Sequence, residues 1–169
     1  IGSSGVRGKF RGRATVNSPN ESLYRLKLAT GYLTDAEKDA KEKRWDKCLG
    51  SAQEAIENAG KSIVTHFRPA PHTHDVDELL EELLQNKNVP EEIRRRIREG
   101  LDDFRDMGMD VHIRATYGDE EAQIPPWDLI AEAEAMGGLN KARRTVALAE
   151  SIYEELNSEG SNANSTRHL

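Results

Sequence analysis

The residues with the clearest potential for chemistry are Arg105, Asp106 and, six residues further on, His112. An arginine keeps its charge and holds a phosphate with a fork of donors, while a histidine titrates near neutral pH and can transfer a proton. A carboxylate such as Asp106 can orient either partner. This combination is what metal-free cleavage of RNA requires. The alternative is that Arg105 caps a helix end and pairs with Asp102 or Asp106.

Three further side chains are candidates for binding RNA or a nucleotide near this pair. Arg114 and Tyr117 follow His112 closely and could reach the same cleft, although Tyr117 could equally be a packing residue with a solvated hydroxyl. Asn58 shares one face of its helix with Glu54 and Lys61, and these residues could line a cleft or form only a polar stripe.

A metal site and a nucleotide-binding loop are both disfavoured by the remaining motifs. His66, His72 and His74 lie close in sequence, but no cysteine or acidic cluster completes a tetrahedral ligand set. Thr73 to Asp75 is better explained as the start of a helix, with Thr73 or Asp75 as its cap. Neither a GxGxxG motif nor a GKS or GKT loop is present. We therefore expect no metal and no cofactor.

Composition predicts an all-helical protein. The 169 residues suffice for one domain with a core, and 36% are hydrophobic while 32% are charged. Alternating β-branched runs are absent, so apolar stripes on solvated helices must supply the core. No apolar stretch reaches the length of a membrane span, and the first residues do not resemble a signal peptide. Cys48, the single cysteine, is expected in the core and fits a reducing compartment, so we expect a cytoplasmic protein.

Charge divides the chain into a basic arm and an acidic domain. Residues 1–20 carry four cations and no acid, and we expect them to form a flexible arm that is either a disordered extension or a nucleic-acid-binding tail. The rest has 20 basic and 30 acidic residues, a net charge of −10, which argues against a large nonspecific nucleic-acid surface. Residues 21–157 are the expected domain, and residues 158–169 the expected flexible polar tail.

The apolar periodicity predicts an up-and-down bundle of four to five main helices. Residues 108–126 are expected to form a long turn, and Gly137-Gly138 is expected to stop a short helix. The dimer that we expect follows partly from the broad apolar faces of the first two helices. The expected helices cover approximately residues 21–43, 45–67, 75–87, 91–107, 127–136 and 140–156.

Several segments of the chain resemble the HEPN domain family. The segment 44–61 begins with Trp45-Asp46 and continues with small residues at helical spacing, as the second helix of that family does. The run 72–75, His-Thr-His-Asp, followed by Glu-Leu-Leu at 78–80, is similar to the opening of its third helix. The first helix, with Leu26, Ala29, Leu33 and Ala36, is also similar. The resemblance extends over residues 22–157.

The resemblance implies a helical bundle that pairs as a homodimer. Many members of the family are RNases in which an arginine, a polar residue and a histidine form the active site, and Arg105, Asp106 and His112 match that pattern. The implied mechanism is metal-independent: the histidine assists attack of the ribose 2′-OH, and the arginine stabilises the charge on the phosphate. Such members are often toxins that a minimal nucleotidyltransferase partner neutralises.

Two departures from the family pattern keep a second functional hypothesis open. Gly108 interrupts the stretch between Arg105 and His112, which catalytic members tend to keep helical. The run 114–119 resembles an Arg-Tyr-Pro-Asp turn of a branch that often lacks the catalytic pair and binds nucleotides or other ligands. The alternative to an RNase is therefore a non-catalytic nucleotide-binding or protein-interaction module that partners a minimal nucleotidyltransferase.

Overall fold

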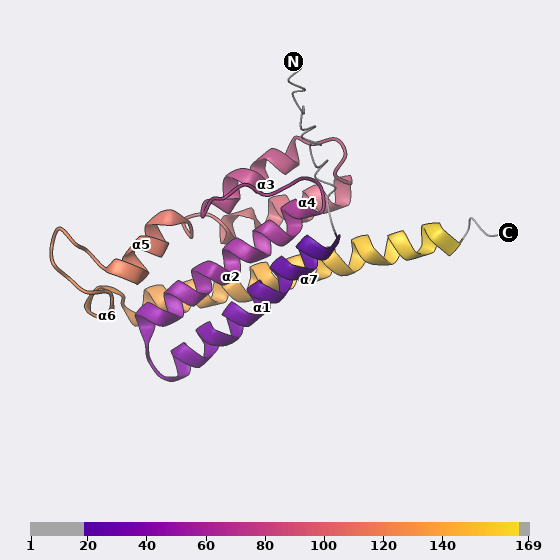
Figure 1. Ribbon diagram of the computed structural model, residues 1–169. Helices are drawn as coiled ribbons and strands as arrows, with labels where there is room; N and C mark the ends of the chain where they lie inside the picture. Colours follow the sequence, from indigo (N-terminus) through magenta and orange to yellow (C-terminus); the bar gives the residue numbers. More distant parts are fainter. Residues whose placement is uncertain (1–18, 166–169) are drawn as a thin grey trace, which may run out of the picture.

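The computed structural model describes residues 19–165 and shows an all-helical bundle, which confirms the predicted fold class (Figure 1). Among these residues the only β-type pairing is an isolated bridge between Asp119 and Ile124. The expected basic arm lies, up to residue 18, outside the described residues. The helices are α1 (Pro19–Lys41), α2 (Trp45–Thr65), α3 (Val76–Leu84), α4 (Glu91–Gly100), the 3-10 helix η1 (Leu101–Asp103), α5 (Met109–Tyr117), α6 (Pro126–Leu129) and α7 (Glu132–Ser165).

Helix α2 is the central element of the bundle. It packs against α1 and α7 along its length, against α3 towards one end and against α5 and α6 towards the other, whereas α4 packs against α3 and α7 (Figure 1). Every residue from Ala55 to Thr65 is buried. Small side chains such as Ala52, Ala55 and Ala59 let neighbouring helices approach closely. Because α2 is covered on all sides over this stretch, its polar residues must find partners inside the protein.

The loop between α2 and α3 is packed directly onto α2. A Cβ atom at Gly60 would lie 2.4 Å from Cγ2 of Val76, so only glycine permits this contact. The close approach holds the segment before Val76, including His74 and Asp75, against the polar face of α2. No helix within residues 19–165 combines the length and the apolar character that a membrane crossing demands.

The expected long turn over residues 108–126 is wrong, because its first part forms α5. Val111 and Ala115 are buried on one face of this helix. Its N-terminus is capped from a distant part of the chain: the backbone N–H of Met109 donates to Oδ1 of Asp75, 3.0 Å away. The sequence predicts Thr73 or Asp75 as the cap of α3, but neither side chain makes a capping hydrogen bond there.

Gly137 and Gly138 do not stop a helix, since α7 runs through both. Gly138 is buried, and a Cβ atom there would lie 2.8 Å from Cδ1 of Leu49 on α2. Its role is therefore close helix packing, not termination. Helix α7 also continues to Ser165, so the backbone of the first part of the expected tail is helical. The helix expected over residues 91–107 ends earlier, at Gly100, and continues only as the 3-10 helix η1.

Candidate functional site

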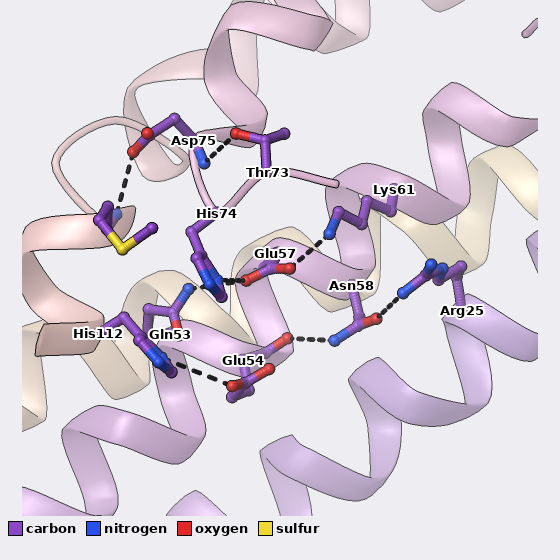
Figure 2. Close-up of polar contacts among 11 residues, drawn as sticks. Arg25, Gln53, Glu54, Glu57, Asn58, Lys61, Thr73, His74, Asp75 and His112 are labelled. Atoms are coloured by element: carbon purple, nitrogen blue, oxygen red, sulfur yellow. Dashed lines mark hydrogen bonds and ion pairs between the residues drawn. The ribbon is translucent and has the colours of Figure 1, made fainter. Parts of the chain in front are cut away.

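Two histidines from separate elements stack at the polar face of α2. His112 lies on α5, and His74 lies in the loop before α3 (Figure 2). Their ring centroids are 4.4 Å apart and the rings are nearly parallel, at 14°. Each side chain keeps 30% of its surface exposed. Both imidazoles are thus positioned by packing but remain within reach of solvent and of a ligand.

Each of these histidines faces its own carboxylate on α2. His74 Nδ1 lies 2.7 Å from Oε2 of Glu57, and His112 Nδ1 lies 3.7 Å from Oε1 of Glu54 (Figure 2). A carboxylate beside an imidazole fixes the orientation of the ring. Two imidazoles with carboxylate partners can provide both a proton acceptor and a proton donor.

Glu57 is the most heavily bonded side chain of the group. Lys61 donates to its Oε1 over 2.5 Å, one helical turn further along α2, and Gln53 Nε2 donates to its Oε2 over 3.0 Å. Burial raises the pKa of Glu57, but the hydrogen bonds from Lys61, His74 and Gln53 outweigh burial and hold the pKa below its usual value. Glu57 is therefore a fixed anion that orders its neighbours.

Glu54 has the opposite electrostatic character. Burial and the nearby charge of Glu57 raise its pKa, although His112 and His74 counteract part of that effect. A carboxyl group that retains its proton more readily, next to a histidine, is suited to proton exchange. Glu54 and His112 therefore form one acid–base pair of the site, and Glu57 and His74 form a second pair that is more extensively hydrogen-bonded.

Asn58 and Arg25 extend the polar group towards α1. The Asn58 amide donates to the backbone carbonyl of Glu54 over 2.9 Å and accepts from Arg25 over 3.2 Å (Figure 2). The Nε atom of Arg25 is buried and has no hydrogen-bond partner among the described residues. Asn58 itself is buried, so its predicted contact with a ligand would require Arg25 to move or the amide to act through Arg25.

An open pocket of about 220 Å³ lies beside His112. Tyr32 of α1, Glu54 of α2 and His112 of α5 line it, together with Lys47 and Ser51 at the start of α2. We call this pocket the histidine cleft. Burial raises the pKa of Tyr32, with a further contribution from Glu54, so its hydroxyl stays a hydrogen-bond donor at neutral pH. The cleft thus presents an imidazole, a carboxyl group and a phenol to a ligand.

The structure places Arg105 in different surroundings from His112. The Arg105 guanidinium donates to Asp102 over 2.7 Å and to Glu81 of α3 over 2.9 Å. Its backbone carbonyl accepts from Lys141 of α7. Asp106 follows with a left-handed backbone, φ 59°. None of the contacts found among residues 19–165 joins Arg105 or Asp106 to His112.

Asp106 and Arg114 both line a second pocket, of about 420 Å³, next to the start of α5. Asp75, Asp77 and Asp110 line the same pocket, so we call it the acidic pocket. Arg114 also forms a two-pronged ion pair with Glu134 of α7, which occupies its donors. An excess of carboxylates in this pocket opposes phosphate binding there.

Tyr117 lies at the end of α5 with 59% of its surface exposed. Within residues 19–165, His66 lies in other surroundings than His74. His66 contacts Ser22 and the ring of Tyr153, and among the described residues no group of three potential ligands could hold a metal ion. Cys48 is buried in the core, as predicted, and burial raises the pKa of its thiol to about 11.

Sequence reasoning missed His74, Glu57, Gln53 and Arg25 as members of the site. The spacing of Glu54, Asn58 and Lys61 on one helical face was the available signal, and Gln53 and Glu57 extend it. A polar stripe on a helix that is otherwise apolar and small indicates internal partners. His74 could not be assigned from the sequence, because only the tertiary packing of its loop brings it to His112.

Comparison with known proteins agrees with this architecture. The sequence profile of the HEPN domain family matches residues 23–159. The chain belongs to the HEPN domain family. A similar solved structure is the crystal structure of TT1696 from Thermus thermophilus, with a TM-score of 0.59 and 23% identity. The match covers 78% of this HEPN-domain chain and 98% of that chain, and at this identity it shows the fold alone. No curated protein matches the chain.

Proposed function

We propose that this HEPN-domain protein binds RNA or a nucleotide in the histidine cleft and cleaves RNA there without a metal ion. The observation that supports this proposal is the stack of His74 and His112, each facing a carboxylate, beside an open pocket. Such an arrangement is costly to maintain by packing alone, because it gathers titratable groups on a buried helix face. A role in proton transfer would explain why these titratable side chains are gathered there.

The proposed reaction is attack of a ribose 2′-OH on the adjacent phosphorus. His112, supported by Glu54, accepts the 2′-OH proton while the new P–O bond forms. The bond from phosphorus to the 5′ oxygen breaks, and that oxygen takes a proton from an acid; His74, held by Glu57, is the proposed donor. The products are a 2′,3′-cyclic phosphate and a free 5′-hydroxyl. Tyr32 and Tyr117 are proposed to contact the RNA bases or sugar.

Arg105 is proposed to stabilise the charge on the phosphate, and Asp106 is proposed to orient Arg105. In the isolated chain its guanidinium is engaged with Glu81 and Asp102, at the exposed surface. Such surface ion pairs contribute about 0–1 kcal/mol, so a bound phosphate can replace them. The proposed homodimer gives a second route, in which Arg105 of one subunit serves the histidine cleft of the other. Arg114 is proposed as a further contact to the RNA, away from the carboxylates of the acidic pocket, after release from Glu134.

Cleavage of a labelled single-stranded RNA in EDTA by three variants tests the proposal. We expect His112→Ala and Arg105→Ala to slow cleavage by about 100-fold or more, because each removes a group acting on the transition state. His72→Ala is the matched control, since this exposed loop histidine lies outside the cleft. Full activity of His112→Ala would refute the proposed active site in the histidine cleft. Full activity of Arg105→Ala, with loss of activity in His112→Ala, would show that Arg105 does not take part in cleavage.

A specific observation favours a second function, that of a non-catalytic interaction module. Met109, Ile113 and Tyr117 recur every fourth residue on the exposed face of α5, and Trp127 of α6 is 69% exposed. Apolar groups gathered in this way mark interaction surfaces. A minimal nucleotidyltransferase in the cytoplasm is the proposed partner. Absence of RNA cleavage, together with loss of complex formation in Ile113→Asp, would favour this second function.

A further inference from the structure

A third pocket, of about 570 Å³, is lined by residues from the end of α1, the turn that leads to α2 and the beginning of α7. Figure 1 shows this turn next to the beginning of α7. Its apolar wall consists of Trp45, Met136 and Leu139, and its cations are Lys41, Lys43 and Arg143. We call it the lysine pocket. Its volume falls within the range of small-molecule sites.

Two of these cations have no partner within the described part of the chain. Lys41 and Lys43 form no ion pair with any residue that the structure describes, and the indole N–H of Trp45 donates no hydrogen bond there. Arg143 is different, because it donates to Glu37 over 3.0 Å and to Asn140 over 3.1 Å. The lysine ammonium groups are therefore the available positive charges of this pocket.

The two acids that line the lysine pocket do not cancel these charges. Glu37 is paired with Arg143. Glu132 lies in the first turn of α7, where the helix dipole favours an acid, and no ion pair between described residues joins it to either lysine. In a domain with a net charge of −10, two unpaired lysines beside an aromatic ring are an uncommon concentration of positive charge.

Lys43 also holds its position at an energetic cost. Its φ is 56°, in the left-handed region that favours glycine, and its side chain forms no hydrogen bond or ion pair with the described residues. This left-handed residue belongs to the turn that ends α1, where the backbone N–H of Arg44 donates to the carbonyl of Asp39, and the turn places Lys43 at the lysine pocket.

We propose that the lysine pocket binds a nucleotide, with the nucleobase against Trp45 and the phosphate between Lys41 and Lys43. An aromatic side chain offers a stacking surface that accepts any base, and ammonium groups at the rim bind the phosphate. The ligand is either a free mononucleotide or the terminal nucleotide of a single-stranded RNA. This site is separate from the histidine cleft, because the two pockets share no lining residue; the nearest lining residues of the cleft in sequence are Asp46 and Lys47.

Fluorescence of Trp45 tests this proposal. The chain has two tryptophans, and Trp127 is exposed, so Trp127→Phe leaves Trp45 as the sole reporter in a folded protein. We expect AMP to change its fluorescence saturably. Ribose 5-phosphate lacks the base and adenosine lacks the phosphate, so each should bind about tenfold or more weakly than AMP. A response to a short oligoadenylate but not to AMP would assign the ligand as RNA.

Charge variants in the same background separate this pocket from nonspecific attraction and from the histidine cleft. Lys41→Glu should weaken binding by about tenfold or more, whereas Lys38→Glu, one turn earlier on α1 and outside the pocket, should change it less than about twofold. His112→Ala should leave Trp45 binding unchanged even if it abolishes RNA cleavage. Equal effects of the two lysine variants, loss of binding in His112→Ala, or no saturable response to either AMP or the oligoadenylate would overturn the proposal.

Discussion

Lys61 and Glu57 form a buried ion pair, so removing either side chain should strongly destabilise the fold. Both side chains are over nine-tenths buried. Lys61→Ala leaves Glu57 with only His74 and Gln53 as partners, and we expect it to lower the free energy of unfolding by about 3 kcal/mol. Lys47→Ala, on the exposed surface of the same helix, should change it by less than about 0.5 kcal/mol. Urea titrations measure both, and equal effects would contradict the assigned role.

The lowered pKa of Glu57 predicts a specific loss of stability in acid. Because the folded-state pKa lies below the ordinary value of 4.5, ionised Glu57 stabilises the fold above that value, and this contribution disappears as the pH falls through the lowered pKa. Melting temperatures between about pH 7 and pH 3 should therefore fall more steeply for the wild type than for the Glu57→Gln, Lys61→Met double variant. Parallel curves would show that Glu57 does not contribute in this way.

Among the helices, α7 has two adjacent glycines at which substitution by alanine should change the stability of the fold in opposite directions. A Cβ at Gly138 would press on Leu49 at 2.8 Å, whereas at Gly137 it would meet nothing within 4 Å. We expect Gly138→Ala to destabilise the fold by about 1–3 kcal/mol through overpacking. Gly137→Ala should stabilise it by about 0.5–1 kcal/mol, because alanine favours a helix interior. Thermal denaturation of the two variants measures the contrast, and a shift of the same sign for both would contradict this packing.

The same two glycines show which elements the sequence could predict. Long helices with regular apolar stripes, such as α2 and α7, follow from periodicity, whereas their ends depend on distant contacts. The pair Gly137-Gly138 is typical of a helix end. In the structure, however, the side chain of Leu49 on α2 leaves room only for glycine at position 138. Helix α5 was missed because its cap, Asp75, lies 34 residues earlier in the chain.

The candidate site was predictable only in part for the same physical reason. Asn58, Glu54 and Lys61 share a helix face, and a local pattern reveals such a set. His112 was recognised by its type, but the partner expected for it, Arg105, contacts Glu81 and Asp102 instead. The partner that the structure provides is His74, which no local spacing relates to His112. Its place depends on Gly60 and Val76, which hold the loop against α2.

At the scale of the whole molecule, the expected homodimer has to use a different surface from the one first considered. The apolar face of α2 is covered within one chain by α1 and α7. The outer face of α1 remains, where Tyr24 is 57% exposed and a Cβ at Gly31 would meet nothing within 4 Å.

Light scattering at micromolar concentration tests this surface. We expect a dimer for the wild type and a monomer of unchanged helicity for Gly31→Arg, because the added side chain clashes only with a second copy. The matched control is Gly137→Arg on α7, at an equally open position, which should remain dimeric. A monomeric wild type would contradict the dimer, and a dimeric Gly31→Arg would exclude this face.

The imidazole NMR signals of the five histidines test most directly whether RNA occupies the histidine cleft. A short oligonucleotide with 2′-deoxy sugars binds without being cleaved, because it lacks the attacking hydroxyl. Single histidine-to-alanine variants assign the signals. We expect saturable shifts of the His112 and His74 signals and a nearly unchanged His72 signal. Unchanged His112 and His74 signals at a concentration where the oligonucleotide is bound would show that RNA does not occupy the histidine cleft.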